Sequence, residues 1–172
     1  FKTLLGNLLN LFSKTYFSPK SFNNHYGVPI SLSNIENYHK YGVFEIGMSK
    51  KGEIHRLSKM VKPDIAVITN TAEAHIENFK NIRGIAKAKG EIIKNIKKGG
   101  TLILNRDDRF FNYHNTLATN QGLKIISFGR SNKSDIHPVS IKKLEKKTII
   151  KIHAINETLF FSFSNLNIYN VL

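Results

Sequence analysis

The chain has 172 residues, 41% of them hydrophobic, no cysteine, and a formal net charge of +14 from 26 basic and 12 acidic residues. This composition excludes a disordered chain, a disulfide framework and a thiolate metal site. No apolar run approaches the roughly 20 residues of a membrane span, so a cytoplasmic globular domain is expected. The lysines are scattered without an arginine-rich stripe, which favours a biased genome composition over a nucleic-acid surface as the source of the charge.

The first 40 residues predict two helices joined by a polar loop. Residues 1–13 place leucines at helical spacing, and Ser18 followed by proline ends that pattern. Asn23 and Asn24 belong to the loop, where a turn is the simplest interpretation of the pair. A short helix to Tyr38 is expected to follow, with a serine at position 31 or 33 as its cap.

Two apolar strands come next, and a polar residue stands in or just after each. The strand predicted from Val43 to Met48 contains Glu45, which is costly to bury unless it is paired or binds a cation. A helix from Gly52 to about Val61 separates it from the second strand, IAVIT. That strand leads into a loop that carries His75.

The helix expected from about Arg83 to Ile96 has a lysine on its apolar side. At 100° per residue, Lys89 lies within the arc of isoleucines and alanines, whereas Lys87 and the other charges lie opposite. Lys89 either extends its amine to water or points into a site. In a poorly solvated place its neutral amine can react with carbon dioxide, and the resulting carbamate suits Mg²⁺.

The remainder predicts two more strands, TLILN and KIISFG, followed by three short alternating strands after Asp135 with a tight turn at Asn156-Glu157. Because strands and helices alternate up to about Gly129, we expect an α/β fold with a mostly parallel sheet and a small antiparallel annex. The expected division is a core at 1–134 and an annex at 135–164. The last eight residues read as the start of a helix.

In such sheets, ligands bind beyond the carboxyl ends of the strands. Glu45, Asn70, His75 and Asn105 occur at or just after such ends. Of these, Glu45 and His75 could hold a divalent ion beside a polyphosphate together with a carbamylated Lys89, which suggests a Mg²⁺-phosphate site. Histidine alone is weak support, because Mg²⁺ prefers oxygen. No GxxxxGK[ST] phosphate loop occurs in the 172 residues. The residues alone therefore favour an α/β domain with a metal-phosphate site.

Several motifs in series resemble the central ATP-binding domain of the Mur ligases. These are NNHYGVP, FEIGMSKKGEI, ITNTAEAHIENF, IAKAKGEI and LNRDD, and NLNIYNVL is similar to the family's HNxxN segment. The resemblance covers nearly the whole chain, and EIGM-x3-GEI points to the members that add D-alanyl-D-alanine. Two departures stand out: Leu166 replaces the histidine of HNxxN, and the family's GKT/S loop would precede Phe1.

The resemblance implies an ATP-dependent, Mg²⁺-requiring amide ligase that is monomeric at full length. Its substrates would be UDP-N-acetylmuramoyl-tripeptide and D-alanyl-D-alanine, with no nucleic-acid partner. Glu45 and His75 would be Mg²⁺ ligands, and Lys89 would be the carbamylated lysine. The resemblance also implies that Asn167 contacts adenine, that Asn105 lies at the ATP site, and that Asn23 and Asn24 face the UDP-linked substrate.

We expect residues 1–172 to be one domain truncated at both ends and inactive alone. Two alternatives remain: a Mur-type ligase with another amino substrate, and a basic module that binds nucleotides or nucleic acid without chemistry. For Asn105, the alternative is that LNRDD mainly shapes the turn from strand to helix.

Overall fold

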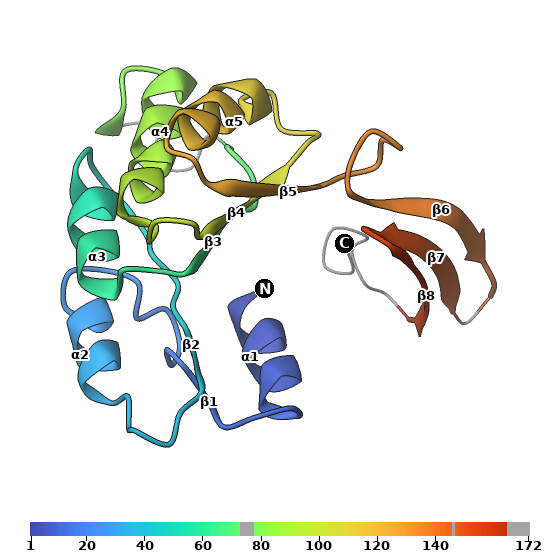
Figure 1. Ribbon diagram of the computed structural model, residues 1–172, viewed down its shortest axis with the longest axis horizontal. Helices are drawn as coiled ribbons and strands as arrows, with labels where there is room; N and C mark the ends of the chain where they lie inside the picture. The colour runs from blue at the N-terminus through green and yellow to red at the C-terminus, as the bar shows by residue number, and fades with distance from the viewer. Residues whose placement is uncertain (73–77, 146, 165–172) are drawn as a thin grey trace. The chain divides into compact units, whose positions relative to one another are not determined.

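The computed structural model describes residues 1–72, 78–145 and 147–164. It forms two compact units, labelled by element in Figure 1. The first unit contains Phe1–Pro63 and Ala72–Lys97, and the second contains Asp64–Thr71 together with the chain from Lys98 onward. Each unit has its own sheet, and the two are described separately. The predicted division at residues 134 and 135 stays a prediction.

The first unit contains helices and a short two-stranded sheet. Its elements are α1 (Lys2–Asn10), β1 (Thr15–Phe17), α2 (Gly27–Ser33), β2 (Tyr41–Val43), α3 (Glu53–Val61), α4 (Ile82–Gly90) and the 3₁₀ helix η2 (Glu91–Asn95). Strands β1 and β2 pair in parallel, and α1 packs on both. Helix α3 packs against α4 and η2, and the apolar core is Val28, Ile54, Leu57, Phe79, Ile85, Ala86, Ala88, Ile93 and Ile96.

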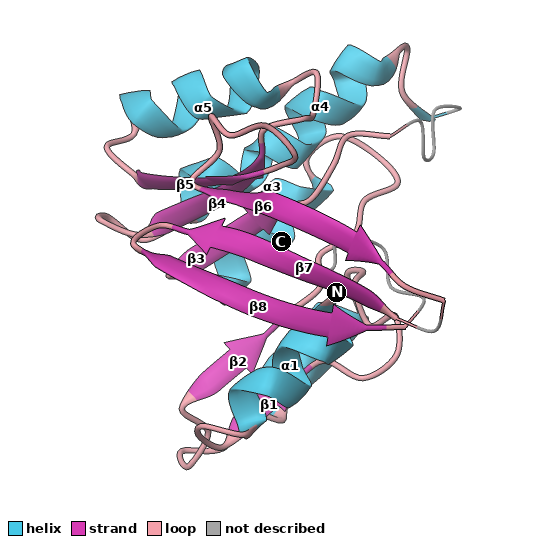
Figure 2. Cartoon of the chain, turned by 90° about the vertical axis from the view of Figure 1, so that its right-hand side faces the viewer, coloured by secondary structure: helices cyan, strands magenta, loops and turns pink. Residues whose placement is uncertain are grey.

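The second unit is a six-stranded sheet in the order β3-β4-β5-β6-β7-β8, with α5 packed on β4 and β5 (Figure 2). The elements are β3 (Ile65–Ile68), β4 (Thr101–Asn105), α5 (Phe111–Asn120), β5 (Lys124–Phe128), β6 (Ile136–Lys143), β7 (Thr148–Ala154) and β8 (Glu157–Phe163). Pairing is parallel from β3 through β6 and antiparallel from β6 through β8. The predicted α/β fold with its antiparallel C-terminal strands is therefore confirmed.

Side-chain hydrogen bonds secure the passage from the parallel to the antiparallel strands. Asp135 accepts hydrogen bonds from the backbone N–H and the hydroxyl of Ser127, both at 2.7 Å. Burial raises the pKa of Asp135, but these bonds outweigh it and hold that pKa below its ordinary value of 3.8. The β7–β8 turn falls on Ile155 and Asn156, one residue earlier than predicted, and Ile155 has a left-handed φ of 59°.

Three other expectations differ from the structure. Helix α2 spans Gly27–Ser33, so it begins before the serines predicted to cap it and ends before the predicted end at Tyr38; Asn24 starts it by accepting hydrogen bonds from the N–H groups of Tyr26 and Gly27. The strand predicted from Val43 to Met48 shares only Val43 with β2, which spans Tyr41–Val43; the backbone that follows leaves the strand pair, because the N–H of Gly47 donates to the carbonyl oxygen of Asn23. Helix α4 tightens into a 3₁₀ helix after Gly90 instead of continuing to Ile96. The helix expected at residues 165–172 lies outside the described residues.

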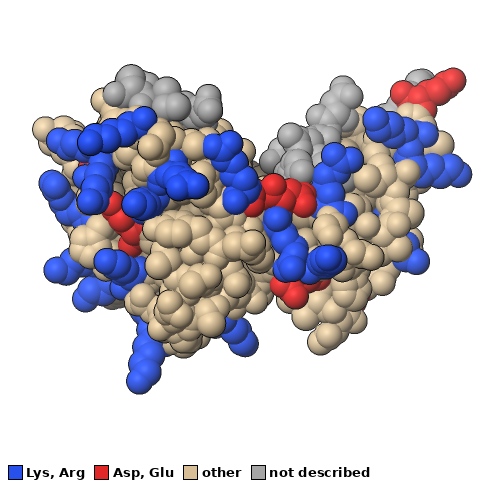
Figure 3. Space-filling model, turned by 90° about the horizontal axis from the view of Figure 1, so that it is seen from above, with Lys and Arg blue, Asp and Glu red and all other residues tan. Residues whose placement is uncertain are grey.

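Lysine and arginine side chains are distributed over the face seen in Figure 3, on both units, with fewer acidic groups between them. This distribution is consistent with the scattered lysines of the sequence. It gives no single basic stripe on that face.

Candidate functional site

The segment between β2 and α3, residues 44–52, carries the predicted metal ligand Glu45. In the parallel β1–β2 pair, Phe17 is opposite Val43, so the C-terminal ends of the two strands lie side by side. There the N–H of Ser18 donates to the carbonyl oxygen of Val43 at 3.0 Å. Glu45 lies just beyond these strand ends, two residues after Val43. We call residues 44–52 the β2–α3 loop.

Among the described residues, Asn23 and Lys2 contact the carboxylate of Glu45. Asn23 Nδ2 donates to Oε1 at 2.9 Å, and Lys2 Nζ lies 3.9 Å from Oε2. The N–H of Gly47 donates to the Asn23 carbonyl oxygen at 2.8 Å, which fastens the same loop a second time and takes its backbone away from β1. The Glu45 side chain is 45% exposed, and a carboxylate has about four lone-pair positions, so it retains capacity to bind a ligand.

Lys2 is buried despite its charge, with 8% of its side chain exposed. Its Nζ donates to the carbonyl oxygen of Ser18 at 2.5 Å and to that of Lys20. Gly6, one turn later on α1, allows a close approach to β1, because a Cβ there would lie 2.5 Å from the ring of Phe17. Sequence reasoning missed Lys2. The available signal was a lysine one turn before a glycine in an otherwise leucine-rich helix.

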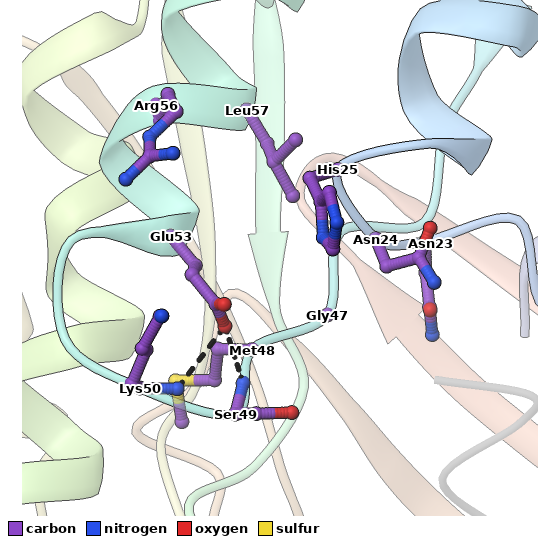
Figure 4. Close-up of a pocket in the computed structure, with 10 residues that line it drawn as sticks. All are labelled: Asn23, Asn24, His25, Gly47, Met48, Ser49, Lys50, Glu53, Arg56 and Leu57. Atoms are coloured by element: carbon purple, nitrogen blue, oxygen red, sulfur yellow. Dashed lines mark hydrogen bonds between the residues drawn. The ribbon is translucent and has the colours of Figure 1, made fainter.

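A pocket of about 440 Å³ opens along the β2–α3 loop within the first unit. The residues that line it carry amide, basic, hydroxyl, carboxylate and apolar groups: Asn23, Asn24, His25, Gly47, Met48, Ser49, Lys50, Glu53, Arg56 and Leu57 (Figure 4). Glu53 accepts hydrogen bonds from the N–H groups of Ser49 at 2.6 Å and Lys50 at 3.1 Å, drawn as dashed lines. The Ser49 bond is the main reason that the pKa of Glu53 lies below its ordinary value of 4.5.

Glu91 in η2 fastens the far end of the loop. Its two carboxylate oxygens accept from the N–H of Gly52 at 2.8 and 3.1 Å, and one also accepts from the N–H of His55 at 3.1 Å. Asn95, one turn later, donates to the hydroxyl of Ser58 at 2.8 Å. Gly52 has φ +88°, a conformation that favours glycine. The first turn of α3 is therefore capped by a side chain distant in sequence.

Lys89 lies in the last turn of α4 and is half-buried, whereas Lys87 is exposed. This difference agrees with the expected place of Lys89 on the apolar side of the helix. Met48 of the β2–α3 loop packs against a cluster on and near α4, formed by Phe79, Ile85 and Ala88. The loop and α4 therefore share a core. Carbamylation of Lys89 stays a prediction.

The other predicted ligands are less completely described. His75 and Asn167 lie outside the described residues, so their roles stay predictions. Within residues 1–72, 78–145 and 147–164, no cluster of three or more His, Cys, Asp or Glu side chains is suited to a metal ion. Mg²⁺ is commonly bound by one or two carboxylates together with phosphate oxygens and water. Glu45, as an oxygen donor with spare lone pairs, fits that mode of binding.

The two asparagines expected at the substrate have different surroundings. Asn24 Oδ1 accepts from the N–H groups of Tyr26 at 3.1 Å and Gly27 at 2.9 Å, which is the turn that the sequence suggested. Asn23 instead contacts Glu45, and both asparagines line the pocket. Their contact with a substrate stays a prediction.

The LNRDD segment shapes the turn from β4 to α5 in the second unit. Asn105 Oδ1 accepts from the N–H of Asp107 at 2.9 Å. Asp108 accepts from the N–H of Phe110 at 2.7 Å, and also from that of Thr71. These contacts agree with the structural role considered for the segment, and a contact of Asn105 with ATP stays a prediction.

Comparison with known proteins gives a family match over the whole chain. The model of the Mur ligase middle domain matches residues 1–172. A UDP-N-acetylmuramoyl-tripeptide–D-alanyl-D-alanine ligase of Buchnera aphidicola (Baizongia pistaciae) is 30% identical over 171 residues, 99% of this chain and 36% of that protein. The ligase of that name from Rickettsia prowazekii is 34% identical over 143 residues, 83% of this chain and 32% of that protein.

Solved structures with similar folds include two MurF proteins. MurF from Acinetobacter baumannii matches with a TM-score of 0.90 and 30% identity over 99% of this chain and 37% of that chain. MurF from Thermotoga maritima, solved in complex with ADP, matches with a TM-score of 0.86 and 26% identity over 99% of this chain and 40% of that chain. The chain thus spans roughly a third of the length of the curated relatives.

Among the residues described, no helix has the length and apolar character to cross a membrane.

Proposed function

Because this chain belongs to the Mur ligase family, whose middle domain it matches along its length, we propose that the polypeptide carrying it is an ATP-dependent amide ligase of peptidoglycan precursor synthesis. The proposed reaction joins D-alanyl-D-alanine to UDP-N-acetylmuramoyl-tripeptide in the cytoplasm. The observation that carries this proposal is the similarity, over 99% of the chain, to a ligase named for that reaction.

The proposed reaction has two steps. The terminal carboxylate of the tripeptide attacks the γ-phosphorus of ATP, the bond to the bridging oxygen breaks, and ADP leaves. The amine of D-alanyl-D-alanine then attacks the acyl carbon, loses a proton, and expels inorganic phosphate as the amide forms. Because both steps bring anionic groups together, alignment and charge neutralisation are the main tasks of the protein.

We assign the charge-neutralising task to residues that would hold Mg²⁺. When bound, the ion would supply positive charge to the phosphate oxygens. Glu45 would bind it directly with His75, and a carbamylated Lys89 would support it. Asn23 keeps the Glu45 carboxylate oriented by the 2.9 Å hydrogen bond to Oε1. Asn167 would contact adenine and Asn105 would lie near the nucleotide.

The pocket along the β2–α3 loop supports an anionic substrate in the first unit. Lys50, Arg56 and His25 contribute basic groups to its lining, and Asn23 and Asn24 contribute amides that can donate hydrogen bonds. The Glu53 carboxylate is engaged by two backbone N–H groups, which offsets part of its charge. We therefore place the UDP-linked substrate along this pocket.

The test is a ligase assay with the complete polypeptide. ATP, Mg²⁺ and both substrates are supplied, and the UDP-linked pentapeptide is measured by mass spectrometry alongside phosphate release. Product should form only when both substrates are present. Product with L-alanine, D-glutamate or a diamino acid and the matching acceptor, but none with D-alanyl-D-alanine, would instead assign another Mur-type reaction. Nucleic-acid binding without ligation would assign the non-catalytic alternative.

Lys89 is tested with its neighbour as the matched control. Lys89→Ala should lower kcat by about 100-fold or more, in the range found for removing a charge-stabilising group. Lys87→Ala, an exposed change in the same helix, should stay within about twofold, as surface substitutions usually do. A Lys89→Ala enzyme with wild-type activity, with and without added bicarbonate, would remove Lys89 from the proposal.

A further inference from the structure

We propose that Lys2 is a positioning residue for Glu45: its buried ammonium group joins the end of β1 to the β2–α3 loop and orients the Glu45 carboxylate. The inference rests on the proposed function only where it treats Glu45 as a metal ligand. The orientation itself follows from contacts within the first unit.

The first step concerns the burial of a charge. A lysine ammonium has three N–H donors and is costly to bury unless they are satisfied. Two of the donors of Lys2 bond to the carbonyl oxygens of Ser18 and Lys20. Carbonyl groups satisfy the donors but carry no net charge. Glu45, 3.9 Å away, supplies the opposite charge.

The second step is that Lys2 is the fixed member of the pair. Only 8% of its side chain is exposed, against 45% for Glu45. Gly6 sets the distance between α1 and β1, because any side chain there would collide with Phe17. If α1 moved outward, it would lose the close contact between Gly6 and Phe17. The position of Lys2 is therefore fixed by the packing of α1, and Lys2 limits the orientation of the Glu45 carboxylate more than Glu45 limits that of Lys2.

A strained turn gives independent support. Lys20 has φ +43°, in the left-handed region that residues other than glycine seldom adopt. Its carbonyl oxygen is one of the two that Lys2 contacts, so the buried ammonium helps to hold this turn. The turn leads directly to Asn23, whose amide contacts the other oxygen of Glu45. Lys2 therefore acts on Glu45 both directly and through the segment that carries Asn23.

Electrostatic repulsion between the Lys2 ammonium and a bound metal ion would act on metal affinity in the opposite direction. An ammonium group 3.9 Å from a metal-binding carboxylate repels the metal, so its removal would tighten metal binding if repulsion dominated. The half-exposed position of Glu45 screens that repulsion, whereas loss of the contact frees the carboxylate to turn. The proposal therefore predicts weaker metal binding when the charge of Lys2 is removed.

The experiment uses the complete polypeptide with Lys2→Met and, as a matched control, Lys40→Met, which removes an exposed charge from the same unit. Mn²⁺ binding is measured by electron paramagnetic resonance with a non-hydrolysable ATP analogue. Hydrogen exchange of residues 44–48 is measured without metal. Lys2→Met should weaken Mn²⁺ binding about tenfold, as loss of a group that orients a metal ligand does, and should speed exchange in the loop. Lys40→Met should change neither.

Lys2→Arg, which keeps a charged donor, should recover most of the Mn²⁺ affinity. A folded Lys2→Met protein with wild-type loop exchange and unchanged or tighter Mn²⁺ binding would overturn the proposal. If Lys2→Met does not fold, Lys2→Gln, which retains donors for the two carbonyls, is judged by the same outcomes. Absence of Mn²⁺ binding in the wild-type protein would contradict the metal role in the proposed function, and loop exchange would still decide the positioning role.

Discussion

Glu91 offers the sharpest test of how the β2–α3 loop is held. The variant Glu91→Ala removes the carboxylate that caps α3 through the N–H groups of Gly52 and His55. The variant Glu91→Gln keeps one neutral oxygen that can still accept one of these bonds. Comparing the two separates the contribution of the charge from that of the hydrogen bond.

The expected loss of local stability follows from the hydrogen bonds that Glu91 accepts. A hydrogen bond to a charged group contributes roughly 1.5–3 kcal/mol, and the carboxylate serves two donors at a helix N-terminus. Glu91 is half-buried, so solvent screening reduces the total, and we expect Glu91→Ala to cost about 2–3 kcal/mol of local stability. Glu91→Gln should cost about 1–2 kcal/mol, because the neutral hydrogen bond that it keeps still contributes about 1 kcal/mol of the total.

The assay is amide hydrogen exchange in the first turn of α3 in the complete polypeptide. A loss of about 2–3 kcal/mol corresponds to exchange roughly 30- to 150-fold faster. Glu36→Ala, which removes an exposed carboxylate from the same unit, is the matched control and should leave α3 unchanged. Unchanged exchange in Glu91→Ala, or an equal increase in the Glu36 control, would refute the capping role of Glu91.

Three further predictions concern single positions. Gly6→Ala should destabilise the protein by about 1–3 kcal/mol in thermal unfolding despite its better helix propensity, because the new methyl group meets Phe17. Because the folded pKa of Glu53 is depressed, the protection it gives to the loop amides is present above pH 4.5 and is lost as the pH falls through its folded pKa. Protection factors of the Ser49 and Lys50 amides, taken relative to the intrinsic exchange rate at each pH, should therefore fall across that range, and constant protection factors would contradict this. Asp135→Asn should destabilise the β5–β6 junction at neutral pH, and the difference from wild type should shrink below pH 3.8, as unfolding curves at several pH values would show, because the hydrogen bonds from Ser127 favour the ionised form.

The hydrophobic periodicity of the sequence was sufficient to predict most of the fold. Strand β4 was predicted with its observed bounds, Thr101–Asn105, because an apolar run between a glycine pair and a polar turn has few other interpretations. The start of α2 was missed because Asn24 was considered only as a turn residue and not as a cap for the helix that follows. Both ends of β2 were missed, and residues 44–48 were wrongly predicted as strand, because the competing bond, from the N–H of Gly47 to the carbonyl oxygen of Asn23, joins residues 24 positions apart.

The candidate site was predictable where it depends on residue type and helical phase. Glu45 was selected because a carboxylate among apolar residues needs a partner, and Lys89 because its helical position differs from that of Lys87. Lys2 and Glu91 were not selected, since their partners are backbone atoms 16 and 39 residues away. A lysine one turn before a glycine in a leucine-rich helix distinguishes Lys2 in the sequence, but hydrogen bonds to backbone leave no pattern in side-chain type, so the partner atoms of Lys2 and Glu91 are known only from the structure.

The first residue of the β7–β8 turn adopts a backbone conformation that its side chain disfavours. The first position of the two-residue turn has the left-handed geometry that hairpins usually give to asparagine, aspartate or glycine, yet it holds the β-branched Ile155, with half of its side chain exposed. Such a residue costs about 1–3 kcal/mol relative to one that adopts the geometry freely. The hairpin is therefore a natural place to begin engineering a more stable version of the protein, because it is remote in sequence from Glu45, His75 and Lys89.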